Sequence, residues 1–251
     1  MKNLVVIGEL IHPLHDAEGP HSLTSVASVC FDLTSSELIL LTSDGILIRC
    51  RVEDKITVVS PCVNVNSALK DDDEPDQPVV VDHTWFLVSF VSETSDLVCI
   101  SHTGNIVCLH RSGDMDHEGC VEGGIGSAVW SADQTTVILT TLNNSLLSMS
   151  NSFEVLQEVP LSSPIALGTA VSMCSSGSSD HFAISSVDAE DTLARIRVYN
   201  KDLEEVAVSR LVGDGSASIV KGIHSTCSSF ATNGSLIAFP LERVKGKLQV
   251  L

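Results

Sequence analysis

Six cysteine and histidine side chains in the middle of the chain could in principle bind a metal ion. They are Cys99, His102, Cys108, His110, His117 and Cys120. Structural zinc sites use Cys or His pairs separated by roughly two to five residues, and no cysteine pair here has that spacing. His15 and His21 do have a nominal spacing of this kind, but no cysteine pair accompanies them. We therefore expect buried thiols and surface imidazoles, with no metal ligands.

The sequence offers no better support for nucleophilic catalysis or for phosphate binding than for a metal site. Serine is abundant, but no Gly-x-Ser-x-Gly segment forms a nucleophile elbow. The glycine-rich segments 123–126 and 213–215 have no Walker lysine and open no predicted helix. Adjacent carboxylates at 190–191 and 204–205 are expected on exposed strands, not as a glycosidase pair. We expect no catalytic residue, no cofactor-binding residue and no enzymatic activity.

Composition excludes further classes of function. The 251 residues carry 14 basic and 32 acidic side chains, a formal charge of -18. Such a field repels nucleic-acid phosphates and anionic membrane surfaces, so we expect direct binding to neither. A hydrophobic content of 43% argues against disorder. Eight scattered cysteines and a start without signal-peptide features predict an intracellular protein with free thiols. We expect it in the cytoplasm, with the nucleus as a second location.

The elements that carry these side chains are predicted to be strands. Apolar residues cluster in short β-rich runs bounded by Ser, Thr, Asp, Asn and Gly. The clearest runs are 37–41, 79–81, 85–88, 137–140 and 196–199. No stretch shows the three-and-four spacing of an amphipathic helix. The sequence therefore predicts an all-β protein.

One hairpin-like unit recurs along the chain: an apolar run, a Ser or Thr, a turn and a second apolar run. It occurs at 40–48, 98–109 and 138–147, and more loosely at 182–199 and 236–250. Ile100 and Thr140 are 40 residues apart, and Ile138 and Phe182 are 44 apart. A period of roughly 40–45 residues with several strands per unit is typical of a WD40-like β-propeller. At that length per blade, the chain supplies roughly five or six blades, so we expect an incomplete propeller spanning residues 1–251.

Two blades are predicted to share one strand-turn-strand motif. The first copy is formed by Trp130, Ser131 and Asp133, and the second by Phe230, Asn233 and Gly234. The aromatic side chain would fill space between blades, and the polar residues would satisfy backbone donors of the turn. A longer interval between the first two hairpins contains an acidic, proline-punctuated run. We expect an inserted loop at 67–78.

Several segments, in order along the chain, resemble the Elongator complex protein 1 family. They are 1–4, 124–134, 151–154, 156–158, 194–201 and 233–238. Tyr199 stands where that family usually has tryptophan. The resemblance implies the first of two N-terminal WD40 propellers, truncated relative to a family whose C-terminal half is a dimerising helical solenoid. Chemistry on the wobble uridine of tRNA belongs, in that family, to a separate subunit with radical-SAM and acetyltransferase-like domains.

The resemblance predicts a non-catalytic scaffold that supports tRNA wobble uridine modification. Its partners would be the other Elongator subunits, including the catalytic one, held by protein–protein contacts of the propeller. Two alternatives remain open at this point. One is a WD40 adaptor of an unrelated complex, and the other is a propeller hydrolase, which would need a clustered acid and histidine site.

Overall fold

The computed structural model describes most of residues 25–210 and three short strands beyond them. The gaps before residue 210 are 33–34, 54–55, 60–61, 71–80, 83, 92, 168–170, 177–180 and 192, and the later strands are at 229–230, 237–240 and 248–250. The chain falls into two compact units, Met1–Glu122 and Gly123–Leu251, each described by itself. No helix among the described residues is long and apolar enough to cross a membrane.

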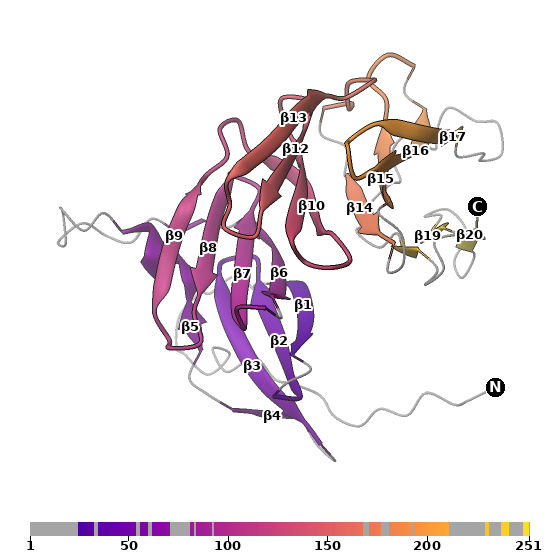
Figure 1. Ribbon diagram of the computed structural model, residues 1–251. Coiled ribbons are helices and arrows are strands. Elements are labelled where there is room, and N and C mark those ends of the chain that lie inside the picture. Colours follow the sequence, from indigo (N-terminus) through magenta and orange to yellow (C-terminus); the bar gives the residue numbers. More distant parts are fainter. Residues whose placement is uncertain are drawn as a thin grey trace, which may run out of the picture. The chain divides into compact units, whose positions relative to one another are not determined.

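The first unit contains two antiparallel sheets (Figure 1). The first has the order β1-β2-β3-β4, with β5 also paired to β3: Val26–Asp32, Glu37–Thr42, Ile46–Val52, Ile56–Val58 and Val63–Asn64. A short 3-10 helix, η2 (Val65–Leu69), follows β5. The second sheet has the order β6-β7-β8-β9: Trp85–Val91, Asp96–Ser101, Asn105–Leu109 and Met115–Cys120.

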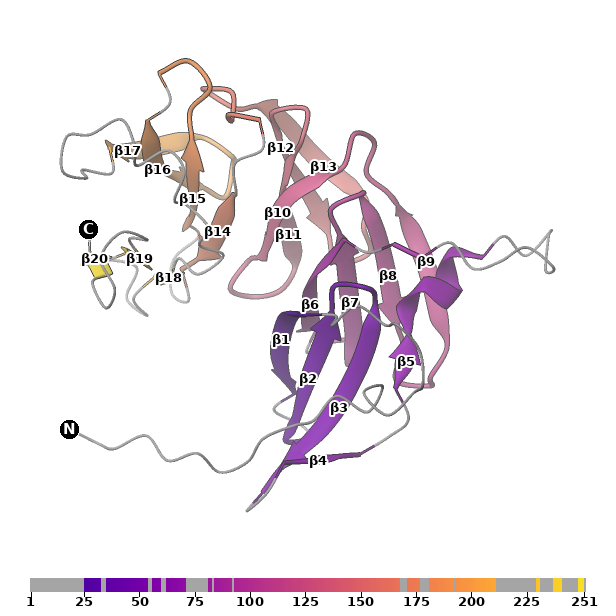
Figure 2. The ribbon, with the colours of Figure 1, turned by 180° about the vertical axis from the view of Figure 1, so that it is seen from behind.

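The second unit repeats the same plan, as the view from behind also shows (Figure 2). One four-stranded sheet contains β10–β13: Ile125–Trp130, Thr136–Thr141, Ser145–Ser150 and Val155–Pro160. The next contains β14–β17: Ser172–Ser175, His181–Val187, Ala194–Asn200 and Glu205–Arg210. A three-stranded sheet contains β18–β20: Ser229–Phe230, Ile237–Pro240 and Leu248–Val250. Neighbouring strands of the second unit are antiparallel and sequential, as expected for propeller blades.

The predicted hairpins are confirmed. The three clear copies of the repeat form β2–β3, β7–β8 and β11–β12, and the looser copies form β15–β16 and β19–β20. Their tight turns use residues that tolerate positive φ: Gly45, Gly104 and Asn144. The predicted strand at 79–81 is not found at Val81, and Val79 and Val80 lie outside the described residues. Of the predicted acidic loop, Ser67–Leu69 belong to η2 and 71–78 lie outside the described residues.

Each unit has its own apolar core. In the first, Leu41 and Leu47 from one sheet and Trp85, Cys99 and Val107 from the other lie in one buried cluster. In the second, the cluster includes Ile138 and Leu146 together with aromatic side chains of the β14–β17 sheet. The rings of Phe182 and Tyr199 stack there with centroids 5.4 Å apart. The inner strands β2, β7 and β11 are buried on both faces, which explains why they are almost continuously apolar.

A buried amide joins the two sheets of the first unit. Asn66, at the start of η2, has no exposed surface, and its amide nitrogen donates to the carbonyl oxygen of Asp44 at 2.7 Å. Its amide oxygen accepts from the backbone N–H of Asp82 at 2.9 Å and from the indole N–H of Trp85 at 3.0 Å. One side chain therefore ties the β2–β3 turn to the beginning of β6.

Asp82 extends this bracing to the next hairpin turn. Its carboxylate accepts hydrogen bonds from the Thr84 backbone and hydroxyl at 2.9 and 2.5 Å, from the Thr103 hydroxyl, and from the Asn105 amide at 3.1 Å. Burial by itself raises the pKa of Asp82. The hydrogen bonds from Thr103, Thr84 and Ser101 outweigh that effect and lower the pKa to about 2.

The close approach at Gly45 predicts a large cost for a methyl group there. An added Cβ would lie 2.6 Å from the Asn66 amide nitrogen and 2.7 Å from the Trp85 indole nitrogen, at φ +86. Gly113 has a similar φ of +98 with nothing within 4 Å, so it is the matched control. We expect Gly113→Ala to lower the free energy of unfolding by about 1–2 kcal/mol. Gly45→Ala should cost about 1–3 kcal/mol more because of the clash.

Urea unfolding followed by tryptophan fluorescence measures this difference directly. If Gly45→Ala and Gly113→Ala lower the free energy of unfolding equally, the close packing of Asn66 and Trp85 against the β2–β3 turn is contradicted.

The lowered pKa of Asp82 predicts a specific pH dependence. A carboxyl whose pKa falls from 3.8 to about 2 on folding stabilises the native state above pH 4, and this contribution is lost as the pH falls through 2. The shift corresponds to about 2 kcal/mol. We therefore expect the stability difference between the natural chain and Asp82→Asn to be largest near neutral pH and to shrink between pH 4 and pH 2. A stability difference that stays constant between pH 4 and pH 2 would refute the lowered pKa of Asp82.

Candidate functional site

A cavity of about 270 Å³ lies within the second unit, between the β10–β13 and β14–β17 sheets. It is lined by Ser131, Ala132, Asp133, Thr135, Thr136, Ile138, Ser148, Leu156, Gln157, Ser175, His181, Phe182, Lys201 and Asp202. Hydroxyl groups, one amide and side chains of both charges therefore face it, beside the apolar Leu156. Gln157 spans the two sheets, because its amide nitrogen donates to the carbonyl oxygen of Asp202 at 3.2 Å.

The first copy of the predicted blade motif forms one wall of this cavity. Asp133 accepts hydrogen bonds from the Ser131 hydroxyl at 2.6 Å and from the backbone and hydroxyl of Thr135 at 3.1 and 2.9 Å. The hydrogen bond from Ser131, followed by those from Thr135, lowers the pKa of Asp133. Ser131 in turn accepts from the backbone N–H of Thr136 at 3.1 Å. Ser131 and Asp133 thus both accept hydrogen bonds from the backbone of this turn.

The aromatic residue of the motif packs within its own sheet. Trp130 is buried and meets Phe153 edge to face, with ring centroids 6.5 Å apart. In the second copy, Phe230 lies in β18, whereas Asn233 and Gly234 lie outside the described residues.

The hydrogen bonds of the pocket's described side chains fix turns and join strands. Nucleophilic catalysis by serine needs a base within hydrogen-bond reach, and that base needs a group that orients it. In the part of the chain that the structure describes, no hydroxyl of the pocket is hydrogen-bonded to His181, and the Ser131 hydroxyl is bound to a carboxylate instead. What the pocket can do is hold a polar, extended segment through hydrogen bonds, with Leu156 as an apolar contact.

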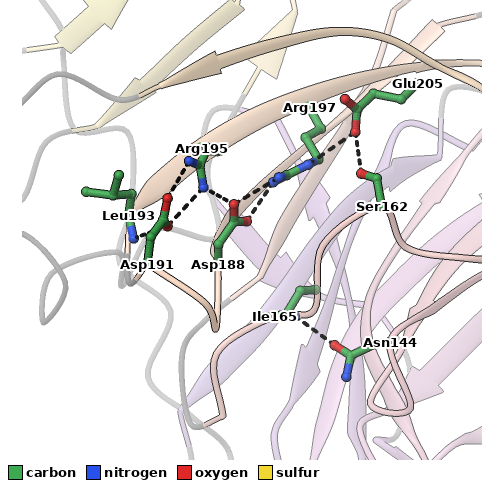
Figure 3. A network of polar contacts seen from close by, with 9 residues as sticks. All are labelled: Asn144, Ser162, Ile165, Asp188, Asp191, Leu193, Arg195, Arg197 and Glu205. Atoms are coloured by element: carbon green, nitrogen blue, oxygen red, sulfur yellow. Dashed lines mark hydrogen bonds and ion pairs between the residues drawn. The ribbon is translucent and has the colours of Figure 1, made fainter.

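A network of charges closes the β15–β16 hairpin in the same unit (Figure 3). Asp188 is 2% exposed, and Arg197 binds both of its carboxylate oxygens, at 2.7 and 2.9 Å. Arg195 binds Asp188 and also Asp191, whose two oxygens lie 3.0 and 2.5 Å from its guanidinium. The Arg197 Nε lies 3.2 Å from Glu205 on β17. Two guanidinium groups are thus surrounded by three carboxylates.

Arg195 and Arg197 lie on a central strand of their sheet. The two side chains do share one face of β16, but β16 lies between β15 and β17 and is not an edge. Burial by itself lowers the pKa of Arg197, and its hydrogen bonds and attraction to Asp188 outweigh that effect and raise it. Both arginines serve to neutralise a buried aspartate and hold the hairpin.

The central Cys and His residues do not form one group. Cys99 is fully buried in the first core, the His102 ring stacks on Phe86 at 4.2 Å, and the Cys120 thiol contacts the Thr103 carbonyl oxygen. Cys108 and His110, in contrast, lie beside carboxylates from neighbouring strands. Potential ligand atoms of Asp96, Cys108 and His110 lie within 4.8 Å of one another, as do those of His110, Asp116 and Glu118.

The sequence prediction missed these carboxylates because it considered ligand spacing only along the chain. In the β7–β8 ladder Leu97 pairs with Leu109, which places Asp96 opposite His110, and in the β8–β9 ladder Cys108 pairs with Asp116. The Thr-Gly turn that ends the first strand was visible in the sequence. Pairing the residues of the two strands outward from that turn would have placed Asp96 opposite His110.

Comparison with known proteins agrees with this architecture. The family model described as ELP1 first N-terminal beta-propeller matches residues 1–173. Among solved structures, the chain is similar to the WD40 domain of Toxoplasma gondii coronin, with a TM-score of 0.60 at 10% identity over 90% of this chain and 57% of that one. It is also similar to the complex of KlAtg21 with the coiled coil of AgAtg16, with a TM-score of 0.58 at 13% identity over 90% and 65%.

The chain thus spans less than two thirds of each of these structures. A search of curated proteins found no significant match. Identities this low show the fold alone. Together with the four-stranded sheets, they confirm the prediction of a WD40-like β-propeller architecture.

The charge network predicts unequal roles for its two arginines. The Arg197 side chain is 10% exposed and that of Arg195 is 22% exposed. Arg197→Met removes the bidentate partner of a buried carboxylate, so we expect a loss of about 3–5 kcal/mol in the free energy of unfolding. Arg195→Met should cost about 1 kcal/mol, since its second partner, Asp191, is exposed to water. Denaturant unfolding followed by tryptophan fluorescence measures both losses, and equal losses would contradict the central place of the Asp188–Arg197 pair.

Proposed function

Because this chain belongs to the family of the ELP1 first N-terminal β-propeller, we propose that it is a non-catalytic scaffold module of the Elongator complex. The observation that carries this proposal is the family match over residues 1–173, more than half of the chain. In that role it supports tRNA wobble uridine modification by holding other Elongator subunits, including the catalytic one, through protein–protein contacts of its blades. We place this work in the cytoplasm, with a nuclear pool as a second location.

The side-chain chemistry supports a scaffold. Four buried polar side chains fix hairpin turns: Asn66 and Asp82 in the first unit, and Asp188 with Arg197 in the second. Such bracing presents loops in fixed positions, which lowers the conformational entropy lost when a partner binds. A net charge of -18 disfavours a direct grip on tRNA, so RNA contact is assigned to partner subunits.

The pocket of the second unit is the best-supported surface for such a partner. It combines hydrogen-bonding groups with an exposed aliphatic side chain, Leu156, on the edge strand β13. An extended segment of a partner protein could lie there and use both the hydroxyl groups and the apolar contact.

Affinity purification of the tagged chain from cells of its source, followed by mass spectrometry, tests the proposed membership. We expect recovery of other Elongator subunits, including the catalytic one. Recovery of the chain without any of them would overturn the proposal, and a consistent set of unrelated partners would favour an adaptor of another complex.

A matched pair of variants tests the pocket as the docking surface. Leu156 in the pocket and Val206 outside it are both exposed aliphatic residues on edge strands, at 57% and 51%. We expect Leu156→Asp to reduce recovery of the partner at least tenfold, while Val206→Asp leaves it unchanged. Equal recovery of the partner with the two variants would show that the docking surface lies elsewhere. It would not contradict the proposed membership in the Elongator complex.

A further inference from the structure

We propose that Asp96, Cys108 and His110 form a binding site for one divalent transition-metal ion, with zinc as the best-fitting ion. The three side chains come from the adjacent strands β7 and β8 and from the residue that follows β8. They lie wholly within the first unit. The site goes beyond the proposed scaffold function and does not depend on it.

The distances match a ligand shell without large movements. The His110 Nδ1 lies 3.2 Å from the Asp96 carboxylate. Its Nε2, on the opposite side of the ring, lies 2.9 Å from the Asp116 carboxylate, which orients the imidazole without being a ligand of the same ion. In a tetrahedral zinc site, nitrogen and oxygen ligands are about 2.0–2.2 Å from the metal, so neighbouring ligand atoms are roughly 3.4 Å apart. The Asp96–His110 pair already has nearly this separation. The metal would lie between these two side chains, near the Cys108 sulfur.

Cys108 is the observation that separates this cluster from an ordinary acidic patch. It is 5% exposed and is a free cysteine, and its thiol has no hydrogen-bond partner in the described part of the chain. Its sulfur nevertheless lies within 4.8 Å of ligand atoms of Asp96 and His110. A buried thiol that faces an imidazole and a carboxylate is a set of donors that selects zinc over magnesium or calcium.

The local charge also favours a cation. Asp96, Asp116 and Glu118 face one imidazole, so the cluster is negative at neutral pH. Burial raises the pKa of Cys108 to about 12, and repulsion from Asp96, Glu118 and Asp116 adds to it. The hydrogen bond to Asp116 raises the pKa of His110, burial opposes this, and Asp96 raises it further. Metal binding must therefore displace protons, and the affinity should fall as the solution becomes acidic.

The architecture gives the metal a structural role. The edge strand β9 is held to the sheet on one side only, by β8. An ion coordinated by Asp96 on β7 and by Cys108 and His110 of β8 and its end would tie these two strands together. The contact between Asp116 on β9 and the Nε2 of His110 would extend this link to the edge strand. Because this ligation is made only in the folded state, the metal should stabilise the protein.

The test is zinc binding by the full chain, freed of metal with a chelator and titrated with zinc chloride in competition with a chromophoric chelator. At pH 7.5 we expect one zinc ion per chain and a higher melting temperature. At pH 5.5 we expect an affinity at least tenfold weaker. Cobalt should give a thiolate-to-cobalt charge-transfer band, since Cys108 would be a ligand.

Two matched pairs of variants make the test specific. Cys108→Ser and His110→Ala should each lower the zinc affinity at least a hundredfold, and Cys108→Ser should abolish the cobalt band. Cys120→Ser and His117→Ala remove a thiol and an imidazole of β9 that lie outside the proposed site. These two variants should leave the zinc affinity and the cobalt band unchanged. Asp116→Asn, at an exposed position, removes the carboxylate that orients the His110 ring and should weaken binding without unfolding the chain. Failure of the natural chain to bind zinc, or equal losses in the control variants, would overturn the proposal.

Discussion

The described structure depends on buried polar side chains that fix the turn of one hairpin to the strand or segment beside it. A four-stranded antiparallel sheet buries its faces by apolar packing, but packing alone does not position its turns. In the first unit that constraint is supplied by Asn66, whose amide reaches the β2–β3 turn with its nitrogen and the start of β6 with its oxygen. Without it, the backbone groups of Asp44 and Asp82 and the indole of Trp85 would each lose a partner, at a cost of about 1–3 kcal/mol per buried group.

The second unit meets the same constraint with charge. Asp188, beside the β15–β16 hairpin, is almost wholly buried and is held by two arginines of the adjacent strand. A buried ion pair of this kind adds little net stability, but breaking it on one side is costly. Asn144 adds a neutral brace, because its side-chain oxygen accepts from the backbone N–H of Ile165 at 2.8 Å. The two units thus fix their turns differently, the first mainly with an amide and the second mainly with ion pairs. Fixed turns of this kind hold the loops of a propeller in defined positions.

The sequence predicted the strands and hairpins well, because local rules decide them. Alternating apolar runs and the turn residues Gly45, Gly104 and Asn144 are readable without tertiary information. The partners of the buried polar groups could not be read in this way. Asn66 lies 22 residues from Asp44, and the interval offers no periodic signal, so only the packed structure shows that its amide is fully used. Arg195 and Arg197 are two residues apart, which places them on one face of a strand, but only the packed structure shows Asp188 and Glu205 beside Arg197.

The central claim is that this propeller module works by holding other Elongator subunits. Cross-linking with an amine-reactive reagent in intact cells, followed by mass spectrometry, tests it most directly, because Lys201 lines the pocket of the second unit. The account predicts cross-links from Lys201 to another Elongator subunit. Cross-links from Lys201 only to proteins outside Elongator would contradict it.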